Sequence, residues 1–269
     1  MKAYRFTGDL EDDPPAAAQA WSLGCRGMQQ DGDEIVAWFD AERSLPFGGR
    51  WEDEDGVDWI AAYLAGLDPV ELESLVVAPT HAQVLLTVPR KVLWLDPGMA
   101  FGTGHHQTTR MALETLEEIA LQDERSLAGR RVLDVGTGSG ILAIAADLLA
   151  ASDALGVDVD PVAITVAEGN ARLNRSRARF ELGSTAEVLA AGESAWSLLL
   201  ANLYAELHVR LLASFEALLA PGGRALLTGI LAERLEQVEA ALPAGLRTLS
   251  VRSDGPWRLL LIERRESVR

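Results

Sequence analysis

VLDVGTGSGILAIAA, residues 132–146, consists of two apolar runs separated by three glycines at alternate positions. The first run has the length and composition of a buried strand, and the second is suited to a helix. A glycine turn between a strand and a helix presents backbone amides and the positive end of the helix dipole, which attract polar or anionic ligands. The stretch therefore predicts a ligand site in an α/β domain.

The alternation of strand and helix continues towards the end of the chain. We expect further strands at 154–160, 179–183, 196–202 and 224–230, a closing strand pair at 246–251 and 257–265, and helices at 108–121, 161–174, 208–220 and 231–242. Strands that alternate with helices of this length predict a doubly wound, mainly parallel, Rossmann-like sheet. Ligands of such sheets bind beyond the carboxyl ends of the strands.

The N-terminal region predicts a small α+β domain of ferredoxin-like type. Residues 3–8 and 50–55 have strand composition, and residues 13–24 suit a helix that begins after prolines and ends at Gly24. Asp31-Gly32 is typical of the turn of a β-hairpin and divides two strand-like runs.

Composition changes near residue 57 and again near residue 68. We therefore divide the chain into an N-terminal domain over 1–56, a linker helix over 57–67 and an α/β domain over 68–269. Trp59 and Tyr63 fall on one face of the linker helix, where their expected role is packing.

The chain has 269 residues and a formal net charge of −16, from 24 basic and 40 acidic residues. This acidic balance counts against a broad nucleic-acid-binding surface and suits a basic partner. Cys25 is the single cysteine, so the sequence offers neither an internal disulfide nor a thiolate cluster for a metal. Without an apolar run of membrane-spanning length or a signal-peptide pattern, we expect a cytoplasmic protein with no membrane association.

The glycine spacing separates two kinds of cofactor. A dinucleotide fingerprint is G-x-G-x-x-G, but after Gly136 and Gly138 the third fingerprint position is Ile141. Asp134 would lie close to the pyrophosphate of NAD, where a carboxylate is unfavourable, whereas it suits the ammonium group of S-adenosylmethionine. Asp158, at the end of the next strand, suits the ribose of either cofactor. The spacing favours a methyltransferase over a dehydrogenase.

A second glycine-rich segment, DPGMAFGTGHHQTT at 96–109, precedes this region. Together with VLDVGTGSGILAIAA, GVDVDPVAI, ANLYAELH and PGGRALLTGIL, in this order and at fitting distances, it closely resembles the bacterial ribosomal protein L11 methyltransferase family. The resemblance covers the chain from about Trp59 to the C-terminus. It implies a class I methyltransferase domain that uses S-adenosylmethionine.

The resemblance also implies a set of site residues. The first glycine segment would cover the cofactor and the second would lie beneath it. Cofactor-binding residues are expected to be Phe101, Gly102, Thr103, Gly104, Thr109, Asp134, Gly136, Gly138, Asp158 and Asn202, and catalytic residues Asn202 and His106, with no metal. Hydroxyls at a helix N-terminus often cap it, so we also expect Thr108 and Thr109 to cap the following helix.

The activity implied is methyl transfer to lysine ε-amines and the N-terminal α-amine of ribosomal protein L11, by a monomer whose N-terminal domain recognises the substrate. Asn202 would hold the target nitrogen, and no direct sequence-specific nucleic-acid binding is expected. Two alternatives stay open: a methyltransferase for another protein or a small-molecule amine, and a non-catalytic module that binds S-adenosylmethionine.

Overall fold

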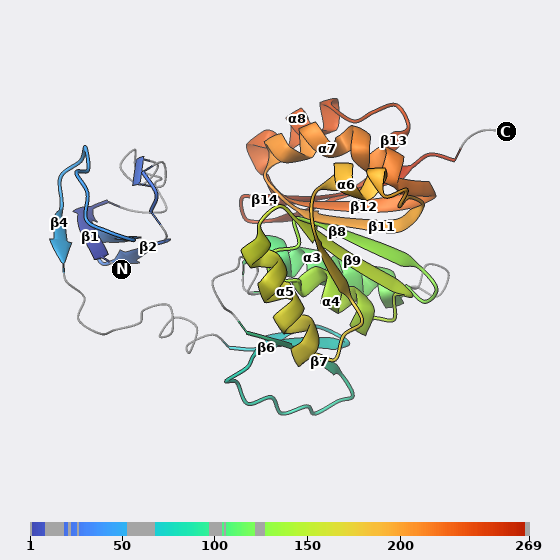
Figure 1. Cartoon of the computed structure of the whole chain (residues 1–269), viewed down its shortest axis with the longest axis horizontal. Helices are drawn as coiled ribbons and strands as arrows, with labels where there is room; N and C mark the ends of the chain where they lie inside the picture. The colour runs from blue at the N-terminus through green and yellow to red at the C-terminus, as the bar shows by residue number, and fades with distance from the viewer. Residues whose placement is uncertain are drawn as a thin grey trace. The chain divides into compact units, whose positions relative to one another are not determined.

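The computed structural model describes residues 2–8, 19–20, 23–25, 27–52, 68–96, 104, 106–121 and 127–266. The chain divides into two compact units, Met1–Tyr63 and Leu64–Arg269 (Figure 1). The linker helix expected over 57–67 lies outside the described residues.

The first unit contains a four-stranded antiparallel sheet. Its strands are β1 (Lys2–Thr7), β2 (Gly27–Asp31), β3 (Glu34–Phe39) and β4 (Arg50–Glu52), in the order β2-β3-β1-β4. This is the strand order of a ferredoxin-like sheet. The predicted hairpin is confirmed, but its turn is Gly32–Asp33, one residue later than expected.

Two segments of this unit qualify the ferredoxin-like prediction. Gln19 and Ala20 are helical and Gly24 has a φ of 86°, as expected for the end of the predicted helix, most of which lies outside the described residues. Between β3 and β4, where a ferredoxin-like fold has a second helix, residues 40–49 contain none. Leu45 and Phe47 from this segment pack against the core.

The second unit is built on a seven-stranded sheet with the order β10-β9-β8-β11-β12-β14-β13 (Figure 1). Its strands are β8 (Arg131–Val135), β9 (Asp153–Asp158), β10 (Arg179–Leu182), β11 (Trp196–Asn202), β12 (Leu219–Leu231), β13 (Leu246–Asp254) and β14 (Trp257–Arg264). β8 to β12 are parallel, and β14 is antiparallel to both β12 and β13. The doubly wound sheet and its closing strand pair are confirmed.

The helices of this unit are α3 (Gln107–Leu121), α4 (Ile141–Leu148), α5 (Pro161–Leu173), α6 (Thr185–Ala190), α7 (Ala205–Leu218), η1 (Ala232–Arg234) and α8 (Leu235–Ala240). α7 begins three residues before its predicted start, and Pro221 lies within β12 rather than after a helix. α6 was not predicted from the sequence, although Ser184 and Glu187 form the capping box that marks its start. Among the described helices, none is long and apolar enough to cross a membrane.

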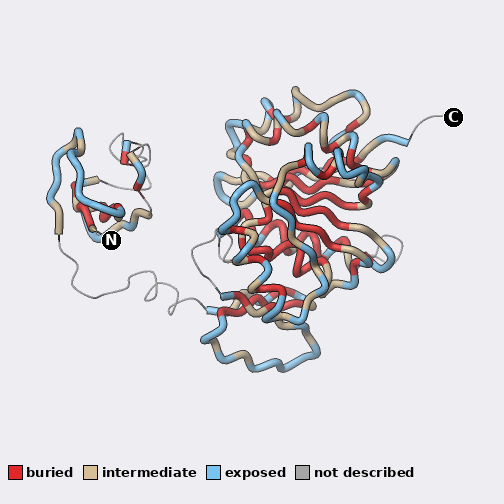
Figure 2. The backbone as a smooth tube through the Cα atoms, viewed as in Figure 1, coloured by how far each residue is buried: buried red, intermediate tan, exposed pale blue. Residues whose placement is uncertain are grey.

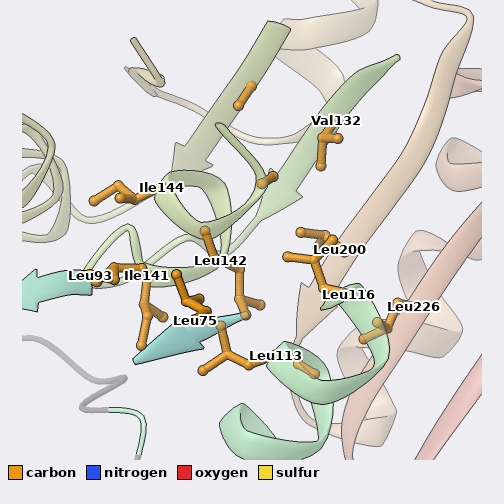
Figure 3. Close-up of a cluster of buried hydrophobic side chains, with 14 of the residues drawn as sticks. Leu75, Leu93, Leu113, Leu116, Val132, Ile141, Leu142, Ile144, Leu200 and Leu226 are labelled. Carbon is orange, nitrogen blue, oxygen red and sulfur yellow. The ribbon is translucent and has the colours of Figure 1, made fainter. Parts of the chain in front are cut away.

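A separate three-stranded sheet was also missed. It consists of β5 (Val70–Glu71), β6 (Leu75–Pro79) and β7 (Lys91–Leu95). Leu75 and Leu93 from this sheet pack with residues of α3 and α4 in one buried cluster (Figure 3). Glu117 of α3, which is 5% exposed, accepts hydrogen bonds from the Glu73 amide at 2.9 Å and the Ser74 amide at 2.6 Å. The buried carboxylate therefore fastens the β5–β6 turn to α3.

Side chains of the central strand β11 alternate between the two faces of the large sheet. Leu198 and Leu200 belong to the cluster that includes α3 and α4, whereas Leu199 and Ala201 belong to the cluster that includes α7. The inner strands of the sheet consist mostly of buried residues (Figure 2), which belong to these two clusters. Strands covered on both sides read as continuous apolar runs, which is why WSLLLAN resembled a parallel strand.

We predict that Gly156→Ala lowers the free energy of unfolding by about 1–3 kcal/mol. A Cβ at this position would lie 2.5 Å from Thr137 Oγ1 and 2.6 Å from Phe180 Cδ1. Gly169→Ala is the matched control, because nothing lies within 4 Å of its Cβ position and alanine favours the helix by about 0.5–1 kcal/mol. Urea unfolding of both variants measures the difference; equal stabilities would contradict the prediction.

Candidate functional site

A pocket of about 670 Å³ opens at the carboxyl ends of the parallel strands of the second unit. Residues at the ends of β8, β9 and β11 line it, together with the start of α3, Gly229 of β12 and Trp257 of β14. This volume lies within the range of small-molecule sites. Its place is the one expected for ligands of a doubly wound sheet.

The glycines after β8 have different roles. Gly136 and Gly138 line the pocket, with φ of 72° and 53°, a backbone region that L side chains rarely adopt. Gly140 is not among the lining residues. Its Cβ would lie 2.9 Å from both Ala167 and Phe180, so this glycine allows α4 to pack closely. Two of the three glycines therefore shape the pocket.

Asp158 connects this loop to the end of β9. Its Oδ2 accepts a hydrogen bond from the Gly138 amide at 3.0 Å, and its Oδ1 accepts one from the Asp160 amide at 3.0 Å. A carboxylate oxygen has room for a further hydrogen bond. Because Asp158 also lines the pocket, its carboxylate is able to accept hydrogen bonds from the hydroxyl groups of a ligand.

Asp134 lines the same end of the pocket but is only 1% exposed. Thr137 Oγ1 donates to its Oδ2 at 2.6 Å, and the Ala143 amide in the first turn of α4 donates as well. Burial nevertheless raises the pKa of Asp134 to about 7. A bound cation close to this carboxyl would favour its ionised form.

Asn202 ends β11 on the other side of the glycine loop. Its Nδ2 donates to Thr109 Oγ1 at 3.2 Å, which orients the amide group. Its Oδ1 lies beside Gly229, where an added Cβ would approach to 3.1 Å. Glycine at 229 therefore keeps this amide oxygen unobstructed, and both residues line the pocket.

His106 is the residue that caps α3. Its Nδ1 accepts a hydrogen bond from the Thr108 amide at 3.3 Å and lies 2.8 Å from Thr108 Oγ1. Thr109 Oγ1 bonds Asn202 instead, so the cap comes from His106 and not from the two threonines as predicted. Partial burial lowers the pKa of His106, so the ring is neutral at pH 7, and an accepting Nδ1 leaves its proton on Nε2.

The structure brings most of the predicted site residues together. His106, Thr109, Asp134, Gly136, Gly138, Asp158 and Asn202 all line the pocket. Gly104 does not; it has a φ of 85°, and its Cβ would lie 3.2 Å from Val77 Cγ1. Phe101, Gly102 and Thr103 lie outside the described residues.

Gly229 and Trp257 also line the pocket, and neither was predicted from the sequence as a site residue. Both stand in runs interpreted as strands; Gly229 lies within PGGRALLTGIL, one of the segments that carry the resemblance, but neither residue was assigned to the site. In the described part of the chain, no three His, Cys, Asp or Glu side chains gather as a metal site would require.

The family model for "Ribosomal protein L11 methyltransferase (PrmA)" matches residues 30–265. The chain belongs to this family. The ribosomal protein L11 methyltransferase of Thermus thermophilus is 44% identical over 262 residues, covering 97% of this chain and 98% of that protein. The one from Deinococcus radiodurans is 39% identical over 280 residues, covering 99% and 100%.

A solved structure supports the same assignment. The ribosomal protein L11 methylase from Lactobacillus delbrueckii subsp. bulgaricus has a TM-score of 0.66 and 30% identity, covering 74% of this chain and all of that chain. The chain is accordingly an S-adenosylmethionine-dependent methyltransferase. The family, fold class and cofactor predicted from the sequence are confirmed.

We predict that Asp134→Asn changes how stability depends on pH. Burial raises the pKa of Asp134 from 3.8 to about 7, so without cofactor the folded protein holds a proton that the unfolded chain releases. The free energy of unfolding of the wild type therefore decreases as pH rises from about 4 to 7. In Asp134→Asn, which has no carboxyl to titrate here, this decrease should be smaller by about 2–4 kcal/mol. Urea unfolding of both cofactor-free proteins at pH 4.5 and pH 8 measures it, and parallel pH profiles would refute it.

Proposed function

We propose that this enzyme transfers methyl groups from S-adenosylmethionine to lysine ε-amines and to the N-terminal α-amine of ribosomal protein L11. The relatives from Thermus thermophilus and Deinococcus radiodurans are named ribosomal protein L11 methyltransferases, which supports the substrate. The observation that carries the chemistry is the amide of Asn202, oriented by Thr109 at the pocket with its oxygen beside Gly229. An amide oxygen is able to accept a hydrogen bond from a neutral amine without holding it as a protonated ion pair.

The cofactor would occupy the end of the pocket formed by β8 and β9. In this proposal Asp158 accepts hydrogen bonds from the ribose hydroxyls, and Asp134 faces the ammonium group. Gly136 and Gly138, which have no side chains, let the loop backbone approach the cofactor closely. Asn202 and Thr109 border the cofactor on the side of the acceptor. Phe101, Gly102, Thr103 and Gly104 remain predicted as the segment that covers it.

When bound, the cofactor supplies an activated methyl group on a sulfonium. The protein's contribution is to align the acceptor and to exclude water. Asn202 Oδ1 accepts an N–H of the amine, which directs the nitrogen lone pair along the pocket, and Thr109 keeps the amide from rotating. The amine proton leaves to solvent. His106 is neutral, and its Nδ1 already accepts a hydrogen bond from the Thr108 amide. We therefore assign it a role in orienting the groups around it in the pocket, and not the role of a base.

The acidic composition, with a net charge of −16, suits a basic ribosomal protein as partner. A monomeric state, a cytoplasmic location and the absence of direct sequence-specific nucleic-acid binding stay predictions.

Incubation with S-adenosylmethionine and purified L11, followed by intact mass measurement, tests the substrate. We expect the mass of L11 to increase by whole multiples of the mass that one methyl group adds. Methylation of a different protein or of small amines alone would favour the first alternative, and cofactor binding without any methylation would favour the binding module.

We predict that Asp158→Ala and Asn202→Ala separate binding from turnover. Asp158→Ala should weaken S-adenosylmethionine binding by about 1–3 kcal/mol, because ribose hydroxyls lose a charged acceptor. Asn202→Ala should lower kcat on L11 by about tenfold or more with a smaller loss of cofactor affinity. Isothermal titration and initial rates measure the two effects. Unchanged affinity in Asp158→Ala would mean that the ribose lies elsewhere.

We further propose that residues 1–56 recognise the substrate. A fragment beginning near Trp59 contains every described lining residue of the pocket and the two buried clusters of the second unit. It should fold and bind S-adenosylmethionine, but methylate L11 more slowly than the full chain, because an amine then reaches the pocket only by chance encounter. A full chain with a lengthened linker should be intermediate. Full methylation of L11 by the fragment at the normal rate would refute this role.

A further inference from the structure

An aromatic side chain stands at the acceptor end of the pocket. Trp257, the first residue of β14, lines the pocket and is half-buried. It packs against the buried cluster that includes α3. Its ring lies 5.2 Å from the ring of His106, at an interplanar angle of 68°. This edge-to-face pair and the packing against the cluster both favour one orientation of the indole.

In the sheet, Trp257 lies closer to Asn202 than to Asp158, because β14 is two strands from β11 and four from β9. β12 lies between β11 and β14, with Asn202 paired to Thr228 and Leu231 paired to Trp257. Thr228 and Leu231 are three residues apart in β12, so Trp257 lies about three residues further than Asn202 in the direction in which β12 runs. This is the carboxyl end of the parallel strands, where the pocket lies. His106, which touches Trp257, precedes α3, whose Thr109 holds Asn202.

Repeated methylation removes the groups that Asn202 is able to hold. A neutral primary amine has two N–H bonds and a monomethylated amine has one, but a neutral dimethylated amine has none. An amide oxygen needs an N–H donor, so Asn202 is able to orient the nitrogen in the first two transfers but not in the third. A third transfer requires a contact that recognises positive charge and methyl groups instead.

The geometry points to Trp257 as the residue that holds the acceptor nitrogen once methyl groups have replaced its N–H bonds. This inference rests on the proposed function and deepens it. An aromatic face attracts a cationic nitrogen and contacts its methyl groups, as in the aromatic recognition of quaternary ammonium groups. Each transfer forms a C–N bond and breaks the methyl C–S bond, whose electron pair stays on sulfur, so positive charge develops on nitrogen opposite the indole. A nitrogen that still carries hydrogen then loses a proton to solvent.

The test compares two substrates that differ only in the methylation of their amines. One is unmodified L11, and the other is L11 whose amines have been converted to dimethylamines by reductive methylation, which leaves only the third transfer. The variants are Trp257→Leu, which keeps apolar bulk without an aromatic face, and Trp257→Phe, which keeps an aromatic face. Trp94→Leu is the matched control, because Trp94 is half-buried in β7 and does not line the pocket.

Trp257→Leu should slow transfer to dimethylated L11 by about 3- to 30-fold, the range expected for a lost cation–π contact, and slow the first transfer to unmodified L11 much less. Trp257→Phe should restore most of the third transfer, and Trp94→Leu should leave both rates as in the wild type. Asn202→Ala should show the opposite selectivity, with the first transfer affected more than the third. Mass spectrometry of the L11 peptides then shows mono- and dimethylated products accumulating in Trp257→Leu.

Equal slowing on both substrates by Trp257→Leu would mean that the indole only supports the fold, and would overturn the inference. A wild-type enzyme that methylates unmodified L11 but not dimethylated L11 would overturn it as well. Failure of the wild type on both substrates, with S-adenosylmethionine still bound, would instead contradict the proposed function.

Discussion

The hydrogen bond from the Gly138 amide to the Asp158 carboxylate joins the loop after β8 to the end of β9, and the pocket is built around it. The loop reaches this position only because Gly136 and Gly138 adopt positive φ and because Gly156 leaves space for Thr137. Thr137 in turn donates to the buried Asp134. A local backbone constraint thus holds both carboxylates at the end of the pocket formed by β8 and β9.

The chemical character of the pocket changes across the sheet. At β8 and β9 the polar groups are carboxylates, one of them with a pKa raised to about 7 by burial. At β11 and β14 they are the amide of Asn202 and the indole of Trp257, and the start of α3 adds the neutral imidazole of His106. Carboxylates suit a cofactor that carries hydroxyls and a cationic ammonium, whereas neutral acceptors and an aromatic face suit an amine that must lose its proton before it reacts.

Elements with a strong local signal could be predicted from the sequence. α5 begins at Pro161 after a capping Asp160, and the double burial of β11 leaves a continuous apolar run. The elements that were missed have weaker signals. α6 is six residues long. β5, β6 and β7 are short strands that follow one another without the intervening helices that mark the rest of the domain. Short elements of this kind are stabilised by tertiary contacts, such as those of Glu117 with the β5–β6 turn, more than by their own propensity.

By itself the sequence determined the strand–glycine–helix unit, the place of Asp158 and Asn202 at strand ends, and the choice of a sulfonium cofactor over a dinucleotide, because these depend on spacing within one or two adjacent elements. Only the tertiary structure decided that His106 caps α3 while Thr109 bonds Asn202, and that Trp257 reaches the pocket. Thr109 and Asn202 are 93 residues apart, and Trp257 depends on β14 pairing antiparallel beside β12. Contacts between residues so distant in the chain follow from the order of strands in the sheet, and no local pattern of residues encodes that order.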